Sequence, residues 1–181
     1  GTATQLAASA AGVLNDAVNI VATTAATVAE ADIIDSRNNI GANTYDITDT
    51  AASIAAAGNA KLAKGVTVTA SNDATAVMAN TIAAYSKAIV YSISDTGANL
   101  VAIAGNALNE AVNITATSAV TVAQRDVIEA ANNSGSNTYD ITDAAANIAV
   151  AGNAKLVTAQ TVTANNVANV PQAITIQAFP K

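Results

Sequence analysis

The chain has 181 residues, of which 51% are hydrophobic, 3% aromatic and 11% charged. It contains no Cys and no His, which excludes disulfides, thiolate nucleophiles, imidazole zinc sites and Ser-His catalytic triads. A net charge of −6 argues against a nucleic-acid partner, because phosphate binding needs a basic surface, and no stretch predicts membrane insertion.

Internal repeats organise the sequence. At an offset of 94 residues, TYDITD from Thr44 recurs at Thr138, and AGNAKL from Ala57 recurs at Ala151. A related copy from Val90 lies between them, so the unit is about 47 residues long, a length typical of solenoids, propellers and arrays. The expected units are residues 1–48, 49–94, 95–142 and 143–164.

Seven segments alternate apolar and small polar residues and are enriched in β-branched side chains, which predicts half-buried strands. Tyr45, Tyr91 and Tyr139 occupy equivalent strand positions and are expected to line one edge of the core. The strands are expected near residues 19–23, 44–48, 66–70, 90–94, 113–117, 138–142 and 160–164.

Ala-rich segments with helical spacing lie between these strands. In three of them an Asp precedes the segment and a Gly follows it, as an N-cap and a C-terminal stop would. The expected structural caps are Asp49, Asp95 and Asp143 with Gly58, Gly105 and Gly152. Further helices are expected within residues 27–39, 72–87 and 121–133.

This order of elements predicts an α/β fold, a right-handed α/β solenoid of about 23-residue coils with two coils in each repeat. A parallel sheet would form one side and short Ala-rich helices the other. A propeller fits less well because each blade needs four strands, and strict repetition disfavours a compact doubly wound domain. Residues 165–181 are predicted to form a C-terminal extension or cap, with a final strand at 173–177.

Four carboxylates are the weak candidates for a calcium site, because Ca²⁺ prefers oxygen ligands. They are Asp46, Asp49, Asp140 and Asp143. No EF-hand loop or Gly-rich calcium nonapeptide accompanies them, so the alternative is helix capping with Asp46 and Asp140 exposed. We predict no catalytic, cofactor-binding or metal residues, and no cofactor.

Charged residues outside the repeated motifs give the closest approach to an enzyme site. These are Arg37, Arg125 and Glu129, which we interpret as a solvated helix face. The single Gly of each AGNA motif does not make a phosphate-binding loop, which needs several Gly and a Lys. We therefore predict that the protein is not an enzyme.

Hydroxyl side chains flank the inward residues of several strands and would form a flat array with about 4.8 Å between strands. Such an array resembles the ice-binding faces of some β-solenoid antifreeze proteins. The alternative is that Thr is simply a favourable residue on an exposed strand. The residues of this binding face would be Thr67, Thr69, Ser92, Ser94, Thr115, Thr117, Thr161 and Thr163.

The phrases ITDTAASI, ISDTGANL and ITDAAANI, each followed by an Ala-rich run and a TVT-type strand, carry a family resemblance. Over residues 1–164 the chain resembles the tandem Ala/Thr-rich repeats of very long secreted bacterial surface proteins, including adhesin-like and repeats-in-toxin-associated exoproteins. The resemblance implies bacterial-type secretion, an extracellular or cell-surface location, and a spacer, matrix or surface-layer role.

The function expected from the sequence is a non-enzymatic extracellular structural or adhesive repeat module. It would act as a surface-layer or filament-forming subunit that associates with itself end to end. The alternative is a binding module that uses the Thr-rich face for ice, a mineral or a glycan.

Overall fold

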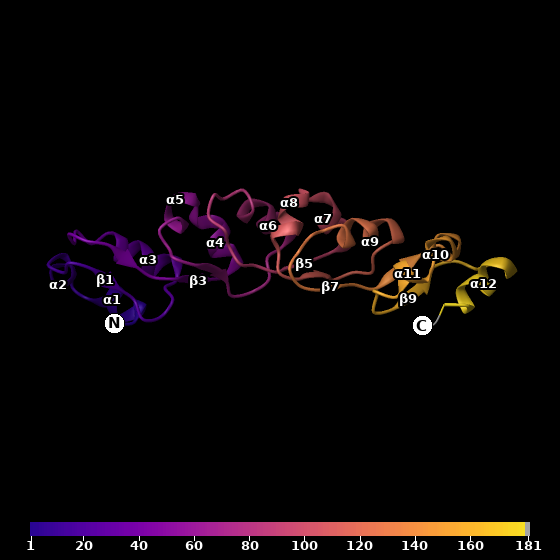
Figure 1. Ribbon diagram of the computed structural model, residues 1–181, viewed down its shortest axis with the longest axis horizontal. Helices are drawn as coiled ribbons and strands as arrows, with labels where there is room; N and C mark the ends of the chain where they lie inside the picture. Colours follow the sequence, from indigo (N-terminus) through magenta and orange to yellow (C-terminus); the bar gives the residue numbers. More distant parts are fainter. Residues whose placement is uncertain (180–181) are drawn as a thin grey trace. The chain divides into compact units, whose positions relative to one another are not determined.

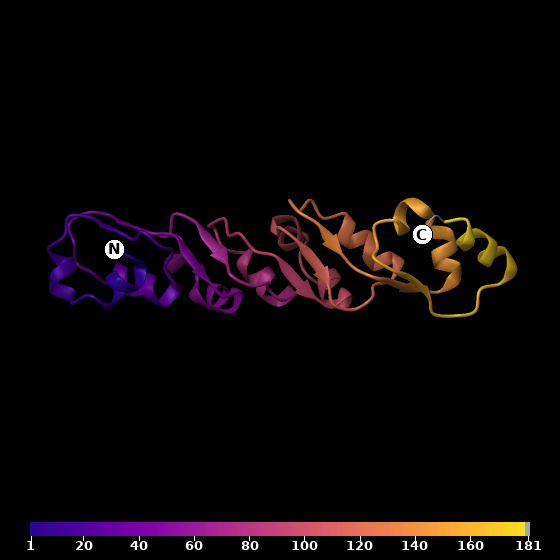
Figure 2. The same ribbon diagram turned by 90° about the horizontal axis from the view of Figure 1, so that it is seen from below.

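The computed structural model describes residues 1–179. Within them the chain is mixed α/β, with twelve helices of four to eight residues and nine strands of two or three residues, and no sheet closes into a barrel. Two compact units are formed, by residues 1–74 with 78–92 and by residues 75–77 with 93 onward. Figures 1 and 2 give two views of these elements.

The first unit contains four strands. Its elements are α1 (Ala3–Ala8), α2 (Ala11–Asn15), β1 (Ile20–Val21), α3 (Val28–Asp35), β2 (Asn43–Thr44), β3 (Ile47–Asp49), α4 (Ala51–Ala57), α5 (Asn59–Leu62) and β4 (Val68–Ala70), with most of α6 (Ala76–Ile82). In Figure 1, α4 and α5 lie above β3.

The second unit contains five strands. Its elements are β5 (Ile93–Asp95), α7 (Gly97–Ala102), α8 (Gly105–Glu110), β6 (Ile114–Ala116), α9 (Val122–Glu129), β7 (Asn137–Thr138), β8 (Ile141–Asp143), α10 (Ala145–Ala151), α11 (Asn153–Leu156), β9 (Val162–Ala164) and α12 (Val170–Gln177). Figure 1 shows α7 and α9 above β5 and β7.

Two kinds of extended segment alternate along the chain. Simple strands are β1, β4, β6 and β9, and tyrosine segments are residues 43–49, 90–95 and 137–143. Each tyrosine segment pairs in parallel with the simple strand before it through its first part, and with the simple strand after it through its second part. The partners lie 21 or 23 residues apart, as between Ile47 and Val68 or Ile20 and Asn43.

The predicted strand positions and their parallel direction are therefore confirmed. The tyrosine segments 43–49 and 137–143 each split into two short strands around their Tyr-Asp pair. The three predicted tyrosines of the core are buried to 2% exposure or less, at Tyr45, Tyr91 and Tyr139. The helices expected within residues 27–39, 72–87 and 121–133 are present as α3, α6 and α9.

The predicted Asp N-caps are wrong by one residue. The N-caps of α4 and α7 are Thr50 and Thr96, whose hydroxyls accept from the amides three residues later, and α10 begins after Ala144. The physical reason is that each Asp is the last residue of a strand, so its backbone is still committed to strand pairing.

The predicted glycine stops are correct at two positions of three. Gly58 and Gly152 separate two helices with φ of 79° and 77°, a backbone conformation that favours glycine. Gly105 is instead the first residue of α8, because Ile103 and Ala104 are extended and already end α7. A turn made by two extended residues does not require positive φ.

Gly58→Ala is expected to destabilise the first unit by about 1–3 kcal/mol, because an L-residue with this φ and with ψ of 157° is strained. No atom within 4 Å would meet the added Cβ, so the effect is one of the backbone alone. Gly105→Ala is the matched control and should be neutral or stabilising by up to about 1 kcal/mol. Urea unfolding followed by circular dichroism measures both, and equal effects would contradict this account.

The predicted final strand at 173–177 is wrong, because these residues belong to helix α12. Asn169 and Gln172 form a capping box, and Pro171 lies in the first turn, where proline needs no amide donor. Pro171 therefore helps to begin a helix rather than to stop a strand. Pro180, the other predicted boundary, lies outside the described residues.

Ala and Ile are the most frequent buried hydrophobic residues, together with Leu, Tyr and Val. The largest fully buried side chains include Ile34, Ile54, Leu100, Ile128 and Tyr139. Among the described residues, none of the helices is both long enough and apolar enough to span a membrane.

Candidate functional site

Hydroxyl side chains line up across the strands. In the second unit Ser94 pairs with Thr115, which pairs with Thr138. Thr48 pairs with Thr69 in the first unit, and Thr142 pairs with Thr163 in the second. Within residues 1–179 none of these hydroxyls hydrogen-bonds to the protein, so all can bond to water or to a ligand.

The outer hydroxyls of the predicted face are placed differently. The hydroxyls of Thr67 and Thr161 donate to the carboxylates of Asp46 and Asp140, which lie on the neighbouring tyrosine segments. Thr117 is exposed, and Ser92 is half-buried. The hydroxyls that pair across strands do not form one continuous row. On a tyrosine segment the residue paired with the strand before it and the residue paired with the strand after it lie four positions apart, as Thr138 and Thr142 do, so the array consists of short separate rows.

A ladder of polar side chains joins successive helices. Asp49 accepts a hydrogen bond from the amide of Val28, the first residue of α3, at 3.0 Å, and Asp143 accepts one from Val122 of α9 at 2.9 Å. The same contact recurs at seven helices, with the acceptor 19 to 21 residues after the donor. The acceptors are Thr24, Asp49, Asn72, Asp95, Ser118, Asp143 and Asn166.

Two carboxylates of this ladder, Asp95 and Asp143, have a pKa below the usual value. Burial raises the pKa of Asp143, but hydrogen bonds from Asn147, Val122 and Ala144 outweigh it and leave the pKa below its usual value. Burial also raises the pKa of Asp95, and hydrogen bonds from Asn99, Ala76 and Thr96 outweigh it, so this pKa is lowered as well.

The four calcium candidates therefore have other partners. Asp49 and Asp143 accept from backbone amides, while Asp46 and Asp140 accept from threonine hydroxyls. Among residues 1–179 no three acidic side chains come together as a metal-binding group. The ladder thus caps helices, as the sequence suggested, although each Asp caps the preceding helix rather than its own.

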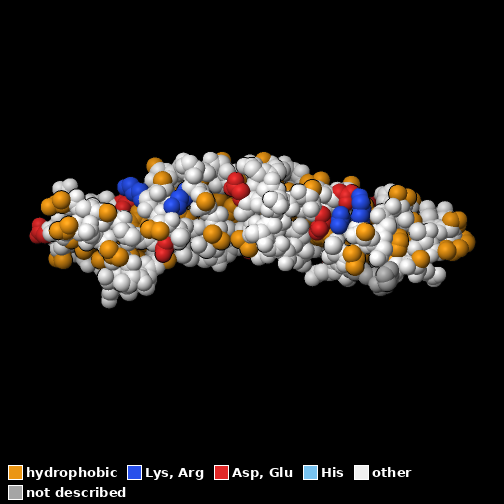
Figure 3. Space-filling model, in the orientation of Figure 1, with side chains coloured by type: hydrophobic (Ala, Val, Ile, Leu, Met, Phe, Trp, Pro, Cys, Tyr) orange, Lys and Arg blue, Asp and Glu red, His pale blue; other side chains and the backbone are white. Residues whose placement is uncertain are grey.

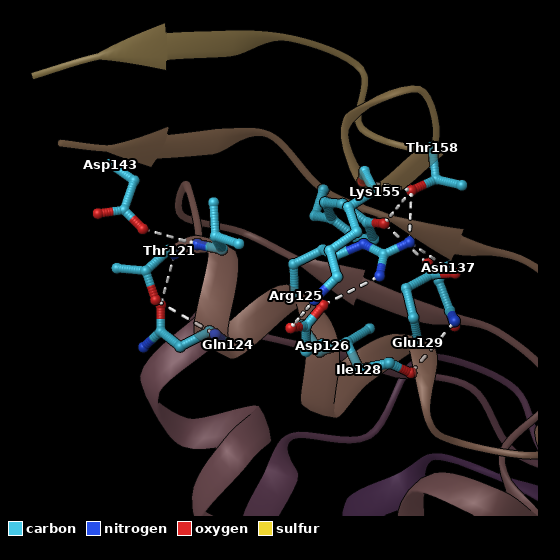
Figure 4. Close-up of polar contacts among 12 residues, drawn as sticks. Thr121, Gln124, Arg125, Asp126, Ile128, Glu129, Asn137, Asp143, Lys155 and Thr158 are labelled. Carbon is cyan, nitrogen blue, oxygen red and sulfur yellow. Dashed lines mark hydrogen bonds and ion pairs between the residues drawn. The ribbon is translucent and has the colours of Figure 1, made fainter. Parts of the chain in front are cut away.

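A second polar network surrounds Tyr139 in the second unit (Figure 4). The Tyr139 hydroxyl donates to Glu129 at 2.8 Å and forms a second hydrogen bond with Thr158 at 2.6 Å. Arg125 contacts Asp126 at 3.1 Å and lies 3.8 Å from Glu129. Every charged group in this network has a partner of opposite sign.

Lysine completes this network. Lys155 of α11 pairs with Asp126 of α9 at 2.6 Å and lowers the pKa of that carboxyl. In the first unit Lys61 pairs in the same way with Asp32, and Lys64 contacts Asp35, which accepts from the Tyr45 hydroxyl at 2.6 Å. The Lys–Asp pair and the bond from the tyrosine hydroxyl to a carboxylate therefore repeat at the offset of 94 residues, whereas Ala31 stands where the second unit has Arg125.

The interpretation of Arg37, Arg125 and Glu129 as a solvated helix face is wrong. The side chain of Arg125 is only 12% exposed and that of Glu129 24%, and Thr158 and Tyr139 bond to them. Arg37 donates to the carbonyl oxygens of Ala7 and Ser9. A signal was present in the sequence, since Asp32 and Lys61 recur as Asp126 and Lys155 with the same spacing of 29 residues.

The two buried tyrosine hydroxyls of this network have raised pKa values. Burial, followed by the hydrogen bond to Asp35, raises the pKa of Tyr45 well above its usual value, and burial likewise raises the pKa of Tyr139. Neither phenol is therefore a ready base near neutral pH. On the face shown in Figure 3, charged side chains are sparse, and blue groups lie beside red ones.

Two open hollows lie beside α9 in the second unit. One, of about 470 Å³, lies between α8 and α9, and the other, of about 430 Å³, lies between α9 and α10. Asp126 borders both, and its partner Lys155 borders the second. Ala and Val supply much of the remaining lining, so the hollows are grooves between small helices.

Comparisons with known proteins found no match among protein-family models, curated proteins or solved structures.

Proposed function

We propose that this protein is a non-enzymatic extracellular structural or adhesive repeat module, built as a right-handed α/β solenoid. In this proposal each coil stacks on the one before it, with strands on one side and short helices on the other. The module serves as a surface-layer or filament-forming subunit, associates with itself end to end, and reaches the cell surface by bacterial-type secretion.

The observation that carries this proposal is the use of polar side chains within the repeat. The helix-capping ladder, the Lys–Asp pairs and the tyrosine hydroxyls all bond to groups about 10 to 30 residues away in the same chain. Their chemistry holds one coil to the next, which is what a load-bearing or spacer repeat requires.

The test of self-association is light scattering of the purified chain over a concentration series. We expect the mean mass to rise with concentration, because exposed strand edges and apolar ends favour pairing between chains. A variant that ends at Val170 removes the rest of α12 and is expected to change that rise. A chain that stays monomeric at millimolar concentration contradicts the filament-forming role and leaves an interior spacer.

A second candidate function is a binding face for ice, a mineral or a glycan. It is favoured by the unpaired hydroxyls of Ser94, Thr115 and Thr138, which lie in register on three neighbouring strands. We place it second because the rows are short and the outer hydroxyls of Thr67 and Thr161 are bonded to Asp.

A further inference from the structure

A hollow in the second unit lies where the first unit places an arginine side chain. It has a volume of about 470 Å³, within the roughly 300–1,000 Å³ of small-ligand sites, and lies between α8 and α9. In the first unit Nη2 of Arg37 donates to the carbonyl oxygens of Ala7 and Ser9, at 3.3 and 3.1 Å. At the offset of 94 residues the counterpart of Arg37 is Ala131, which lines the hollow. The second unit therefore lacks the side chain that bonds to these carbonyls in the first.

The backbone around this position is the same in the two units. The amides of Arg37 and Ala131 both donate, at 3.2 Å, to the carbonyl oxygen three residues earlier. In both units the amide of the following residue donates to an Asn side chain 23 residues earlier, at 2.9 and 2.8 Å. The units therefore differ here in one long side chain and not in the path of the chain.

The acceptors that Arg37 uses have counterparts in the second unit. Ala7 and Ser9 lie at the C-terminal end of α1. At the end of α7 the equivalent residues are Val101 and Ile103. Among residues 1–179 no donor bonds to the carbonyl oxygens of Val101 and Ile103. Unpaired carbonyls at a helix C-terminus carry partial negative charge, so they favour a cation.

Apolar side chains supply most of the lining of this hollow. Ile103 follows α7, Leu108 lies on α8, and Val127 lies on α9. The aliphatic stem of an arginine can pack along such walls while its guanidinium reaches polar acceptors. The hollow is open to solvent, so a side chain carried by a separate chain can enter it.

The charges beside the hollow also allow a cation. Asp126 borders it, and the hydrogen bond from Lys155 lowers the pKa of that carboxyl, so it is negative at neutral pH. The pairing of Asp126 with Lys155 does not exclude a second cation nearby. In the first unit Asp32 pairs with Lys61 in the same way, and Arg37 is still accommodated at the end of α1.

We propose that this hollow, here called the α8–α9 hollow, binds the guanidinium group of an arginine side chain that another polypeptide supplies. The guanidinium donates to the carbonyl oxygens of Val101 and Ile103, as Arg37 does to their counterparts in the first unit. Its stem covers the apolar walls. Binding of this kind requires neither an extracellular location nor self-association, so it goes beyond the proposed structural role.

A second folded copy of this chain is not the expected partner. Within the 181 residues the arginines are Arg37 and Arg125. Arg37 is bonded at the end of α1, and Arg125 donates to Asp126 and Thr158. Both are therefore engaged in the folded chain, and the expected partner is a different polypeptide with an exposed arginine.

The probe is the peptide Gly-Arg-Gly, acetylated and amidated at its ends, titrated into the isotope-labelled intact chain. We expect saturable amide chemical-shift changes at residues 101–109 and 126–131, with a dissociation constant on the order of 1 mM, as is usual for a ligand of this size. The same peptide with citrulline, which has nearly the same shape but no charge, is expected not to bind. Guanidinium ion alone lacks the stem and should bind about tenfold more weakly or less.

Ala131→Arg tests the site from within the chain, because it restores the side chain of the first unit. We expect this variant to lose peptide binding and to unfold at a higher temperature. Arg37→Ala is the converse variant and should create a second site, with shifts at residues 7–15 and 32–37. Val150→Ala, which lines the hollow on the other side of α9, is the control and should bind as the native chain does.

The proposal is overturned by absence of saturable shifts at high millimolar peptide, by equal binding of the citrulline peptide, or by unchanged binding to a folded Ala131→Arg chain. Equal affinity for guanidinium ion and for the peptide assigns the hollow to a free cation and also overturns it. If Ala131→Arg does not fold, the arginine and citrulline peptides compared on the native chain decide the question.

Discussion

Tyr139→Ala is expected to destabilise the second unit by about 3–5 kcal/mol, the largest effect of any substitution considered. The ring is 1% exposed and its hydroxyl bonds to Glu129 of α9 and to Thr158, so its removal leaves a cavity in the core. The hydroxyl of Thr158 and the carboxylate of Glu129 also lose a hydrogen-bond partner. Urea unfolding followed by far-ultraviolet circular dichroism measures the free energy of unfolding.

Two control variants separate the ring from its hydroxyl. Tyr139→Phe keeps the ring and should cost about 1 kcal/mol, the value of one hydrogen bond. Val150→Ala, at a side chain 87% exposed on α10, should change stability by less than about 0.5 kcal/mol. If the Phe and Ala variants lost equal stability, packing of the ring would not be the cause.

Asp143→Ala is expected to cost about 2 kcal/mol at neutral pH, because the two part-buried backbone amides that lose their acceptor fall at the low end of the roughly 1–3 kcal/mol of an unsatisfied buried group. The substitution leaves the amides of Val122 and Ala144 and the side chain of Asn147 without their acceptor. Asp143→Asn is the matched variant. It retains an acceptor like Asn72 and Asn166, which occupy the same position in other coils, and should cost about half as much or less.

The pH dependence of these variants has a defined sign. The pKa of Asp143 is lower in the folded chain than its usual value of about 3.9, so its contribution to stability is present above that pH. The contribution is lost as the pH falls through the folded pKa. Asp143→Asn should therefore lose less stability than the native chain between about pH 4 and pH 2. An identical acid profile, or stability of the native chain that depends on added Ca²⁺, would contradict the capping role.

The repeat made much of the fold predictable. The recurrence of TYDITD and AGNAKL at one offset indicated which segments are equivalent, and period-two alternation indicated which are strands. The parallel pairing of Ile47 with Val68 and of Ile141 with Val162 follows from that spacing. Where the repeat is strict, local patterns and tertiary contacts favour the same strands and the same pairing, so the sequence predicts both.

The errors arose mainly where a partner distant in the sequence decides the structure. Asp143 is a residue type typical of an N-cap and precedes a helix. Its carboxylate nevertheless accepts from the amide of Val122, 21 residues earlier, which no local pattern reveals. Residues 173–177 alternate like a strand, yet Asn169, Pro171 and Gln172 begin a helix before them. Arg125 resembles a surface residue in sequence, but its guanidinium donates to Thr158, which lies 33 residues later in the chain.

The direction of the helix-capping ladder has a consequence for how the chain folds as it is made. At all seven contacts the acceptor comes later in the sequence than the helix it caps, by 19 to 21 residues. A chain that emerges N-terminus first, from a ribosome or through a membrane pore, therefore cannot cap the first amide of these seven helices until about twenty more residues have appeared. Only the most recently made of these helices lacks its cap at any moment, which limits the unsatisfied backbone exposed to other nascent chains.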